Sequence, residues 1–177
     1  MSYPACVIAP LLLVVLGLAC NDTAPARSVS QGPGFAIETH SHRPSAEPVL
    51  VVDDNAMNLM VARLQLKQCW PQSHVVVASS AAEALKLLEA EAFDVALIDM
   101  IMPEMDGMQL TQQIRLQFSN TTSHMPILAL TANTNPVERQ RCLDAGMDDV
   151  LHKPMDLEQL VRVIPQHIAR VRSLQRA

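Results

Sequence analysis

The feature that most constrains this chain is an alternation of short apolar runs with longer segments of helix-forming residues. Val, Leu, Ile and Ala dominate the runs, and polar or turn residues separate them. The runs cover residues 49–53, 74–78, 94–98, 126–130 and 149–152. Continuous apolar runs of this length are typical of strands buried on both faces. The alternation predicts an α/β fold in which helices cover both faces of a five-stranded parallel sheet.

The segments between and after these runs are predicted to be helices. Ser79 and Ser80 precede the second helix as capping residues, with Glu83 placed to complete a capping box. Pro165 is predicted to kink or split the last helix, which Asp156 can cap. The first helix is expected to carry a wide apolar face through Met57, Met60, Val61 and Leu64. The expected helices cover residues 55–69, 81–90, 108–118 and 136–145 and a segment that follows Asp156.

The N-terminal segment differs from the rest of the chain. Residues 5–20 are uncharged and mostly apolar, but this run is shorter than the roughly 20 residues that span a membrane. Three alternatives remain open: a secretory signal whose end resembles a lipoprotein signal at Cys20, a membrane anchor, and an upstream extension from a misassigned start. We expect residues 21–47 to form a flexible linker and residues 48–173 to form the globular domain.

Charge and cysteine content exclude some functions. The chain has 13 basic against 18 acidic residues and a net charge of −5, which argues against binding to nucleic acid. The four cysteines lack the spacing of a zinc site. Cys69 and Cys142 are therefore expected to be buried reduced thiols, with a disulfide between them left as an alternative.

Polar residues gather where the predicted strands end. In open parallel sheets, ligands bind beyond the carboxyl ends of the strands, where Asp53, Asp54, Asp99, Thr131 and Lys153 are expected. Two carboxylates about 4 Å apart repel each other by about 4 kcal/mol at an effective dielectric constant near 20. A bound Mg²⁺ removes that cost, because it prefers hard oxygen ligands. An Asp held beside a metal, an ammonium and a hydroxyl is suited to accept a phosphoryl group.

Each of these residues also has a simpler interpretation. Asp53 or Asp54 could cap the helix that follows the first strand. Thr131 could hydrogen-bond its own backbone, and Lys153 could be an ordinary surface residue. It is the joint placement at successive strand ends that favours a functional site.

Four stretches of the sequence resemble motifs of a known protein family. Residues 51–55 (VVDDN), 99–107 (DMIMPEMDG), 129–132 (ALTA) and 153–154 (KP) resemble the receiver domain of two-component response regulators. The resemblance covers about residues 48–170. It implies a doubly wound, flavodoxin-like sheet with the strand order 2-1-3-4-5.

The resemblance also implies roles for individual residues. Asp99 would be the phosphoacceptor, and Asp53, Asp54, Asp99 and the backbone carbonyl of Ile101 would hold Mg²⁺. Thr131 would hydrogen-bond a phosphoryl oxygen. Lys153 would pair with the phosphoryl group, and its bond to Pro154 is expected to be cis. The chain would not be a conventional enzyme, but would catalyse its own Mg²⁺-dependent phosphorylation and a slow dephosphorylation.

Finer features resemble the receivers of hybrid sensor kinases and phosphorelays. These features are Asp53-Asp54-Asn55 with Asn58, and the stretch over residues 141–149. They imply a phosphohistidine donor on a histidine kinase or phosphotransfer domain, and hence a cytoplasmic location, with residues 5–20 as a candidate membrane tether. The partner surface would involve the first helix and the loop around Pro154 and Met155. Met57 and Met60 belong either to that surface or to the core.

Two positions depart from the family pattern. Val150 stands where the family usually has an aromatic switch residue, which leaves a non-phosphorylated interaction module as the alternative function. Ile101 lies two residues after Asp99 and cannot orient a water molecule by hydrogen bonding, so we expect slow self-dephosphorylation. Ile101 also disfavours an aspartyl-phosphate phosphatase, which needs a second Asp at that position. The downstream target is not indicated by the sequence.

Overall fold

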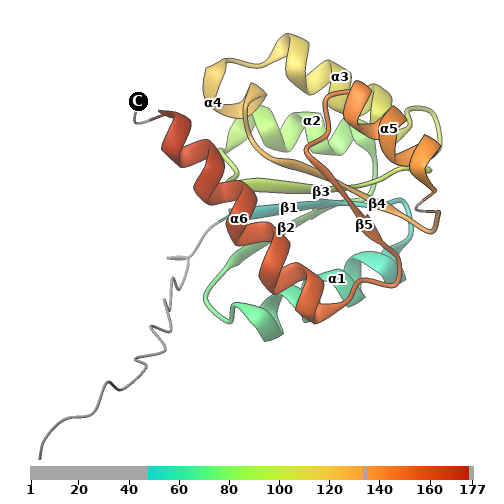
Figure 1. Ribbon diagram of the computed structural model, residues 1–177, viewed down its shortest axis with the longest axis vertical. Helices are drawn as coiled ribbons and strands as arrows, with labels where there is room; N and C mark the ends of the chain where they lie inside the picture. Colours follow the sequence, from blue (N-terminus) through green and yellow to red (C-terminus); the bar gives the residue numbers. More distant parts are fainter. Residues whose placement is uncertain (1–47, 134, 176–177) are drawn as a thin grey trace, which may run out of the picture. The chain divides into compact units, whose positions relative to one another are not determined.

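The five apolar runs form five parallel strands of one sheet in a computed structural model that describes residues 48–133 and 135–175 (Figure 1). The order along the sheet is β2-β1-β3-β4-β5, which confirms the expected doubly wound topology. β1 and β3 pair in register, with Val52 opposite Ile98. The strands are β1 (Pro48–Val52), β2 (His74–Ala78), β3 (Val95–Asp99), β4 (Ile127–Thr131) and β5 (Asp149–His152).

Helices cover both faces of the sheet (Figure 1). α1 (Ala56–Cys69) and α6 (Leu157–Gln175) pack on one face, where Leu66 and Leu160 are buried. α2 (Ala81–Ala90), α3 (Gly107–Gln117) and α5 (Pro136–Asp144) pack on the other, where Leu110 and Cys142 are buried. A short helix, α4 (Asn120–Ser123), lies between α3 and β4 and was not expected from the sequence. Burial on both faces explains why the strands read as unbroken apolar runs.

Side chains fix where the helices begin. The Ser80 hydroxyl accepts a hydrogen bond from the Glu83 N–H, while the Glu83 carboxylate accepts from the N–H and hydroxyl of Ser79. This confirms the predicted cap of α2, although Glu83 contacts Ser79 and not the capping residue itself. Asp106 and Gln109 form a complete capping box at the start of α3. These caps place the loops that follow β2 and β3.

The predicted apolar face of α1 is wrong as a core-facing stripe. Met57, Met60, Val61 and Leu64 are all exposed, whereas the helix buries Leu59, Ala62 and Leu66 against the sheet. α1 is apolar around much of its circumference, so the sequence alone did not reveal which stripe faces inward. The interpretation of Met57 and Met60 as core residues is therefore excluded.

Pro165 does not split α6, so that part of the sequence prediction is wrong, while a kink at Pro165 stays a prediction. The helix is continuous from Leu157 to Gln175 with Pro165 inside it. Val163 and Ile164 before the proline and Ile168 after it are all buried against the sheet. We infer that this packing outweighs the lost backbone hydrogen bond at Pro165. The cap is as expected, since the Asp156 carboxylate accepts from the Glu158 N–H.

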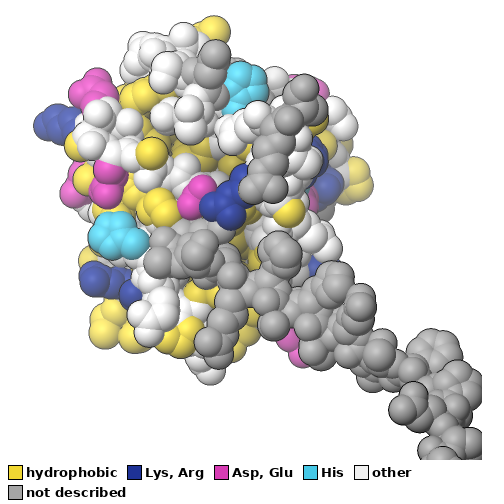
Figure 2. Space-filling view, turned by 90° about the vertical axis from the view of Figure 1, so that its left-hand side faces the viewer, with side chains coloured by type: hydrophobic (Ala, Val, Ile, Leu, Met, Phe, Trp, Pro, Cys, Tyr) yellow, Lys and Arg dark blue, Asp and Glu magenta, His cyan; other side chains and the backbone are white. Residues whose placement is uncertain are grey.

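An arginine organises the end of the sheet that lies opposite the strand carboxyl ends. Arg115 on α3 donates to the backbone carbonyls of Ser123, Met125 and Gly146 and to the carboxylate of Asp148. Asp148 also accepts the Ile127 N–H at the start of β4. The face that carries α4 and the end of α6 shows acidic and basic side chains next to each other (Figure 2). Arg115 therefore links α3, the segment before β4 and the segment before β5.

Several sequence expectations lie outside the described residues. These are the apolar segment 5–20, which contains Cys20, and the linker 21–47. Within residues 48–133 and 135–175, none of the helices is both long and apolar enough to cross a membrane. Cys69 and Cys142 are both free thiols, which excludes the alternative of a disulfide between them.

Candidate functional site

The topology brings the predicted site residues to one end of the sheet. Asp53 and Asp54 directly follow β1, and Asp99 ends β3, its hydrogen-bonded neighbour. Thr131 ends β4, and Lys153 directly follows β5. Because all strands run in the same direction, their carboxyl ends lie at one edge.

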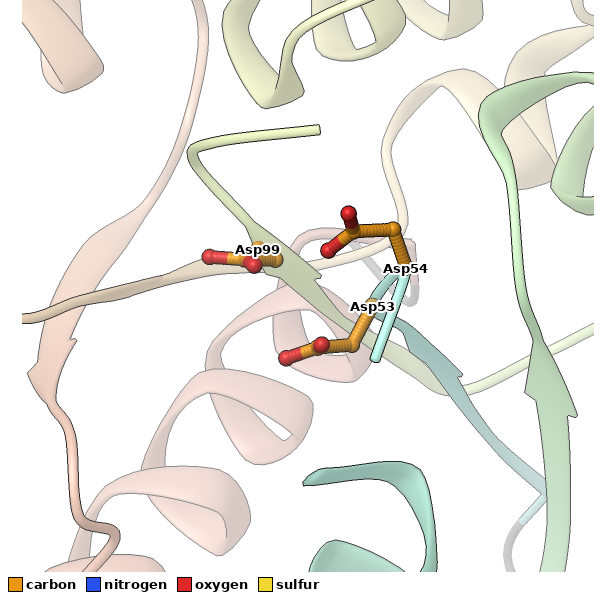
Figure 3. A group of neighbouring side chains, drawn as sticks. All are labelled: Asp53, Asp54 and Asp99. Carbon is orange, nitrogen blue, oxygen red and sulfur yellow. The ribbon is translucent and has the colours of Figure 1, made fainter. Parts of the chain in front are cut away.

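The three aspartates form a compact group (Figure 3). Asp53, Asp54 and Asp99 each place a carboxylate oxygen so that the three atoms lie within 4.8 Å of one another. Asp53 and Asp99 are buried, while Asp54 is exposed. The group therefore contains two carboxylates that are shielded from solvent, Asp53 and Asp99, and one that is accessible to solvent, Asp54.

Lys153 connects the two buried carboxylates. Its ammonium nitrogen lies 2.6 Å from an oxygen of Asp53 and 2.9 Å from an oxygen of Asp99. The Lys153 side chain is only 22% exposed. The interpretation of Lys153 as an ordinary surface residue is therefore wrong. The Lys153–Pro154 peptide bond is cis, as the resemblance implied.

Burial and charge shift the pKa values in this group. Burial raises the pKa of Asp99, and the nearby Asp53 charge adds to that effect, while Lys153 opposes it. Burial by itself would lower the pKa of Lys153. The hydrogen bonds and charges of Asp53 and Asp99 outweigh it and leave that pKa raised. Lys153 is therefore held in its charged form between two acids, where it neutralises part of their repulsion.

Asp53 is held by several donors. It accepts the Asn55 N–H at 2.9 Å and, at 3.0 and 3.2 Å, the side-chain amide of Asn58 on both carboxylate oxygens. The helix cap is Asn55, whose side chain accepts the Met57 N–H. The alternative in which an aspartate caps α1 is therefore wrong. The sequence pattern indicates Asn58 only as a subtype feature, although a polar residue in the first turn of the helix after Asp53 is a signal for this contact.

Thr131 is buried at the end of β4, but its hydroxyl bonds within its own loop. It donates to the carbonyl of Asn133 at 3.2 Å and accepts the Asn133 N–H at 3.1 Å. The simpler interpretation of Thr131 therefore describes this structure. Its role toward a phosphoryl oxygen stays a prediction.

Ile101 and Val150, the two departures from the family pattern, occupy contrasting environments. The Ile101 side chain is 81% exposed, and its N–H donates to Asp99 at 3.4 Å. Val150 is buried in the core on the face of α2, α3 and α5. The Ile101 carbonyl as a metal ligand stays a prediction, and so does the effect of Val150 on signalling.

The donor set fits a small divalent cation. All the side-chain ligands are carboxylate oxygens, which Mg²⁺ prefers. Oxygens bound to one Mg²⁺ lie about 3.0 Å apart when adjacent and about 4.2 Å apart when opposite, so the three carboxylate oxygens, which lie within 4.8 Å of one another, would draw together around the ion. The residues that would hold the ion are Asp53, Asp54 and Asp99.

Exposed apolar residues lie next to the acidic group. Val61 and Met155 line a cavity of about 230 Å³ between α1 and the loop after β5, which also reaches Asp53 and Lys153. The Gln65 amide donates to the Met155 carbonyl at 2.9 Å and ties this loop to α1. The exposed side chains of Met57, Met60 and Leu64 continue this surface along α1.

Comparisons with known proteins agree with this geometry. The family model described as the response regulator receiver domain matches residues 49–165. Two curated relatives are the sensor histidine kinase RcsC of Salmonella typhi and the sensor protein GacS of Pseudomonas syringae pv. syringae. The chain is 40% identical to RcsC over 124 residues and 39% identical to GacS over 120 residues. These alignments cover 70% and 67% of the chain, but only 12% and 13% of the relatives.

A solved structure gives a similar result. The receiver domain of the sensor histidine kinase PA1611 from Pseudomonas aeruginosa PAO1 superposes with a TM-score of 0.63 at 32% identity. The match covers 70% of this chain and 98% of that one, which was solved with a magnesium ion coordinated in its active-site cleft. The chain belongs to the response regulator receiver domain family of two-component systems. It spans about an eighth of the length of the curated relatives.

Proposed function

We propose that this chain accepts a phosphoryl group on Asp99 and works in a phosphorelay. The observation that carries the proposal is the pair of contacts from Lys153 to Asp53 and Asp99 inside the acidic group. A buried carboxylate beside a fixed ammonium can become an acyl phosphate, because the ammonium then pairs with the added negative charge. Membership of the receiver family supports the same role.

The transfer would proceed by displacement at phosphorus. An Asp99 carboxylate oxygen forms the new bond to phosphorus as the bond to the donor's imidazole nitrogen breaks. That nitrogen leaves with the bonding electron pair and takes up a proton. Lys153 is placed to pair with the phosphoryl oxygens, and Thr131 would have to exchange its contact with Asn133 to donate to one of them. Mg²⁺ held by the three aspartates would neutralise the charge that gathers on the phosphoryl group.

The donor in this proposal is a phosphohistidine of a histidine kinase or a phosphotransfer domain. The curated relatives are themselves a sensor histidine kinase and a sensor protein. The surface offered to that donor is the exposed apolar stripe of α1 together with the cavity between α1 and Met155. A partner seated there would lie directly beside Asp53 and Lys153, which also line that cavity.

We propose a cytoplasmic location and a receiver domain over residues 48–173. The location follows from the proposed donor, which acts in the cytoplasm, with residues 5–20 as a candidate tether. The C-terminal limit is supported by Ile168, which is buried in the core three residues beyond the end of the family match.

The decisive test is the intact mass of the chain after treatment with acetyl phosphate and Mg²⁺. We expect one added phosphoryl group, which is lost in Asp99→Asn and in the absence of divalent metal. Unmodified protein, under conditions that label a known receiver, would contradict the proposal and favour the non-phosphorylated interaction module.

A second experiment tests the docking surface. Met60→Glu should slow transfer from a phosphohistidine donor while leaving labelling by acetyl phosphate unchanged, because only the macromolecular donor needs the surface. Leu116→Glu is the matched control, since Leu116 is exposed on α3. Equal slowing by both variants, or by neither, would remove α1 as the docking surface.

A further inference from the structure

Asn58 makes an unusual contact for an exposed residue. Its side-chain nitrogen lies 3.0 Å from one oxygen of Asp53 and 3.2 Å from the other. A carboxylate only accepts hydrogen bonds, so the amide must present its NH₂ group here and not its oxygen. The partner carboxylate is 1% exposed. An exposed side chain thus reaches in from α1 to a buried acid.

The other donors to Asp53 each reach a single oxygen. The Asn55 N–H bonds Oδ1 at 2.9 Å, and the Lys153 ammonium bonds Oδ2 at 2.6 Å. Among the described residues that donate to Asp53, Asn58 is the donor that contacts both oxygens. A donor that contacts both oxygens of a carboxylate resists rotation of the carboxylate about the Cβ–Cγ bond. A donor that contacts a single oxygen resists this rotation less.

Rotation matters because Lys153 competes for the same carboxylate. Its ammonium is shared between Asp53 and Asp99. If Asp53 turned toward Lys153 with both oxygens, it would present less negative charge to a cation beside Asp54. Contacts that orient a ligating carboxylate commonly change metal affinity by 10–100-fold.

We propose that Asn58 is a positioning residue that holds the Asp53 carboxylate in the orientation that a divalent cation requires. The proposal rests on the function proposed above and adds a residue to its site. Asn58 also lies among the exposed residues of α1, so a docked partner would cover the same amide. The metal site and the docking surface then share one residue.

A purely structural role for Asn58 makes a different prediction. Asn58 is the third residue of α1 and lies in its first turn, where helix propensity matters less than at an interior position. Replacing Asn58 by Ala therefore changes the stability of the helix itself little. If Asn58 acts only through the helix, its removal leaves metal affinity unchanged.

The test is a calorimetric titration of the full unphosphorylated chain with MgCl₂. We expect Asn58→Ala to raise the Kd for Mg²⁺ about tenfold. Asn58→Gln, which keeps an amide on a longer side chain, should give an intermediate Kd. Gln68→Ala is the matched control, because Gln68 is also an exposed amide on α1, and its Kd should stay within about twofold of the native value.

Labelling by acetyl phosphate provides a second readout. In Asn58→Ala the Mg²⁺ concentration for half-maximal rate should rise with the Kd, while the rate at saturating Mg²⁺ recovers to within about threefold. A native Kd in Asn58→Ala overturns the proposal and leaves the proposed function intact. A weaker Kd accompanied by a large loss of thermal stability in the metal-free protein also overturns it, in favour of a structural role. If the native chain neither binds Mg²⁺ nor becomes labelled, both proposals fail.

Discussion

Gly107 packs directly against the backbone of Asp99. A Cβ atom at residue 107 would lie 2.4 Å from the Asp99 carbonyl oxygen and 3.1 Å from the Asp99 carbonyl carbon. The Gly107 N–H also donates to the Met100 carbonyl at 3.2 Å. The start of α3 is therefore pressed against the end of β3, and the position of Asp99 depends on the absence of a side chain at residue 107.

We predict that Gly107→Ala displaces the loop after Asp99. The obstructing atom belongs to backbone and cannot swing aside, so α3 or the loop must move. We expect a loss of about 2–4 kcal/mol in the free energy of unfolding and a clear loss of Mg²⁺ affinity. Urea denaturation and calorimetry would measure the two effects. Gln109→Ala is the control, because Gln109 also lies in the first turn of α3 and its replacement removes the capping box without a clash at Asp99. If Gly107→Ala kept the native free energy of unfolding and the native Mg²⁺ affinity, the prediction would be wrong, because the loop would accommodate the added methyl group without cost.

Ile101 is predicted to protect the acyl phosphate from water. Its side chain is almost fully exposed beside Asp99 and offers no hydrogen bond to an attacking water molecule. Ile101→Asn should shorten the lifetime of phosphorylated Asp99 several-fold, because an amide can orient water. Decay of the phosphorylated species can be followed by intact mass after removal of acetyl phosphate. A lifetime that is unchanged or longer in the variant would contradict this role.

The sequence was informative wherever local chemistry decides structure. Strand positions and the convergence of Asp53, Asp99 and Lys153 at one edge were predictable, since parallel strands align their ends. The order of the strands was implied by the resemblance to receiver domains. The sequence did not predict which side of a helix faces the sheet. α1 carries apolar residues on more than one side, so the inward stripe of Leu59 and Leu66 could not be separated from the exposed stripe of Met57 and Met60.

Other features depended on contacts between distant segments. Pro165 lies in a continuous helix because buried residues on both sides of it pack on the sheet, which local propensity does not describe. The hydroxyl of Thr131 donates to the carbonyl of Asn133 within its own loop. The sequence does not decide between this backbone partner and a phosphoryl oxygen. The contacts of Arg115 bring together residues up to 33 positions apart, with no local pattern to indicate them.

Arg115 is predicted to be a major determinant of stability. Its guanidinium satisfies three backbone carbonyls and Asp148, and burial lowers its pKa while Asp148 opposes that shift. Arg115→Met keeps the aliphatic stem but leaves these acceptors without their donor. We expect a loss of about 3–5 kcal/mol in the free energy of unfolding. The control is Arg63→Met, at an exposed position of α1, which should change stability by less than about 0.5 kcal/mol.

The measurement for Arg115 is urea denaturation at neutral pH, monitored by circular dichroism. A milder variant, Arg115→Lys, keeps the charge but cannot supply the same planar set of donors, so it should fall between the native chain and Arg115→Met. If Arg115→Met were as stable as the Arg63 control, the network would contribute nothing to folding.

Asp149 gives the fold a predictable dependence on pH. Burial alone would raise the pKa of its carboxyl, but the Val150 N–H and the ion pair with Arg139 at 2.8 Å lower it overall, with help from His167. A carboxyl whose pKa is lower in the folded state stabilises the fold above its unfolded pKa, near 3.9. That contribution disappears as the pH falls through the lower pKa of the folded state.

We therefore expect Asp149→Asn to reduce the free energy of unfolding by about 1–2 kcal/mol at pH 7. The difference from the native chain should persist to about pH 5 and shrink below about pH 4, where the carboxyl of the unfolded chain takes up a proton before that of the folded chain does. Urea titrations at several pH values would measure it. Asp144→Asn is the matched control, because Asp144 is exposed on α5 and its carboxylate accepts a hydrogen bond from the Gln140 amide on the same helix. A difference for Asp149→Asn that stayed constant down to pH 3 would mean that packing, and not the charge, accounts for the loss.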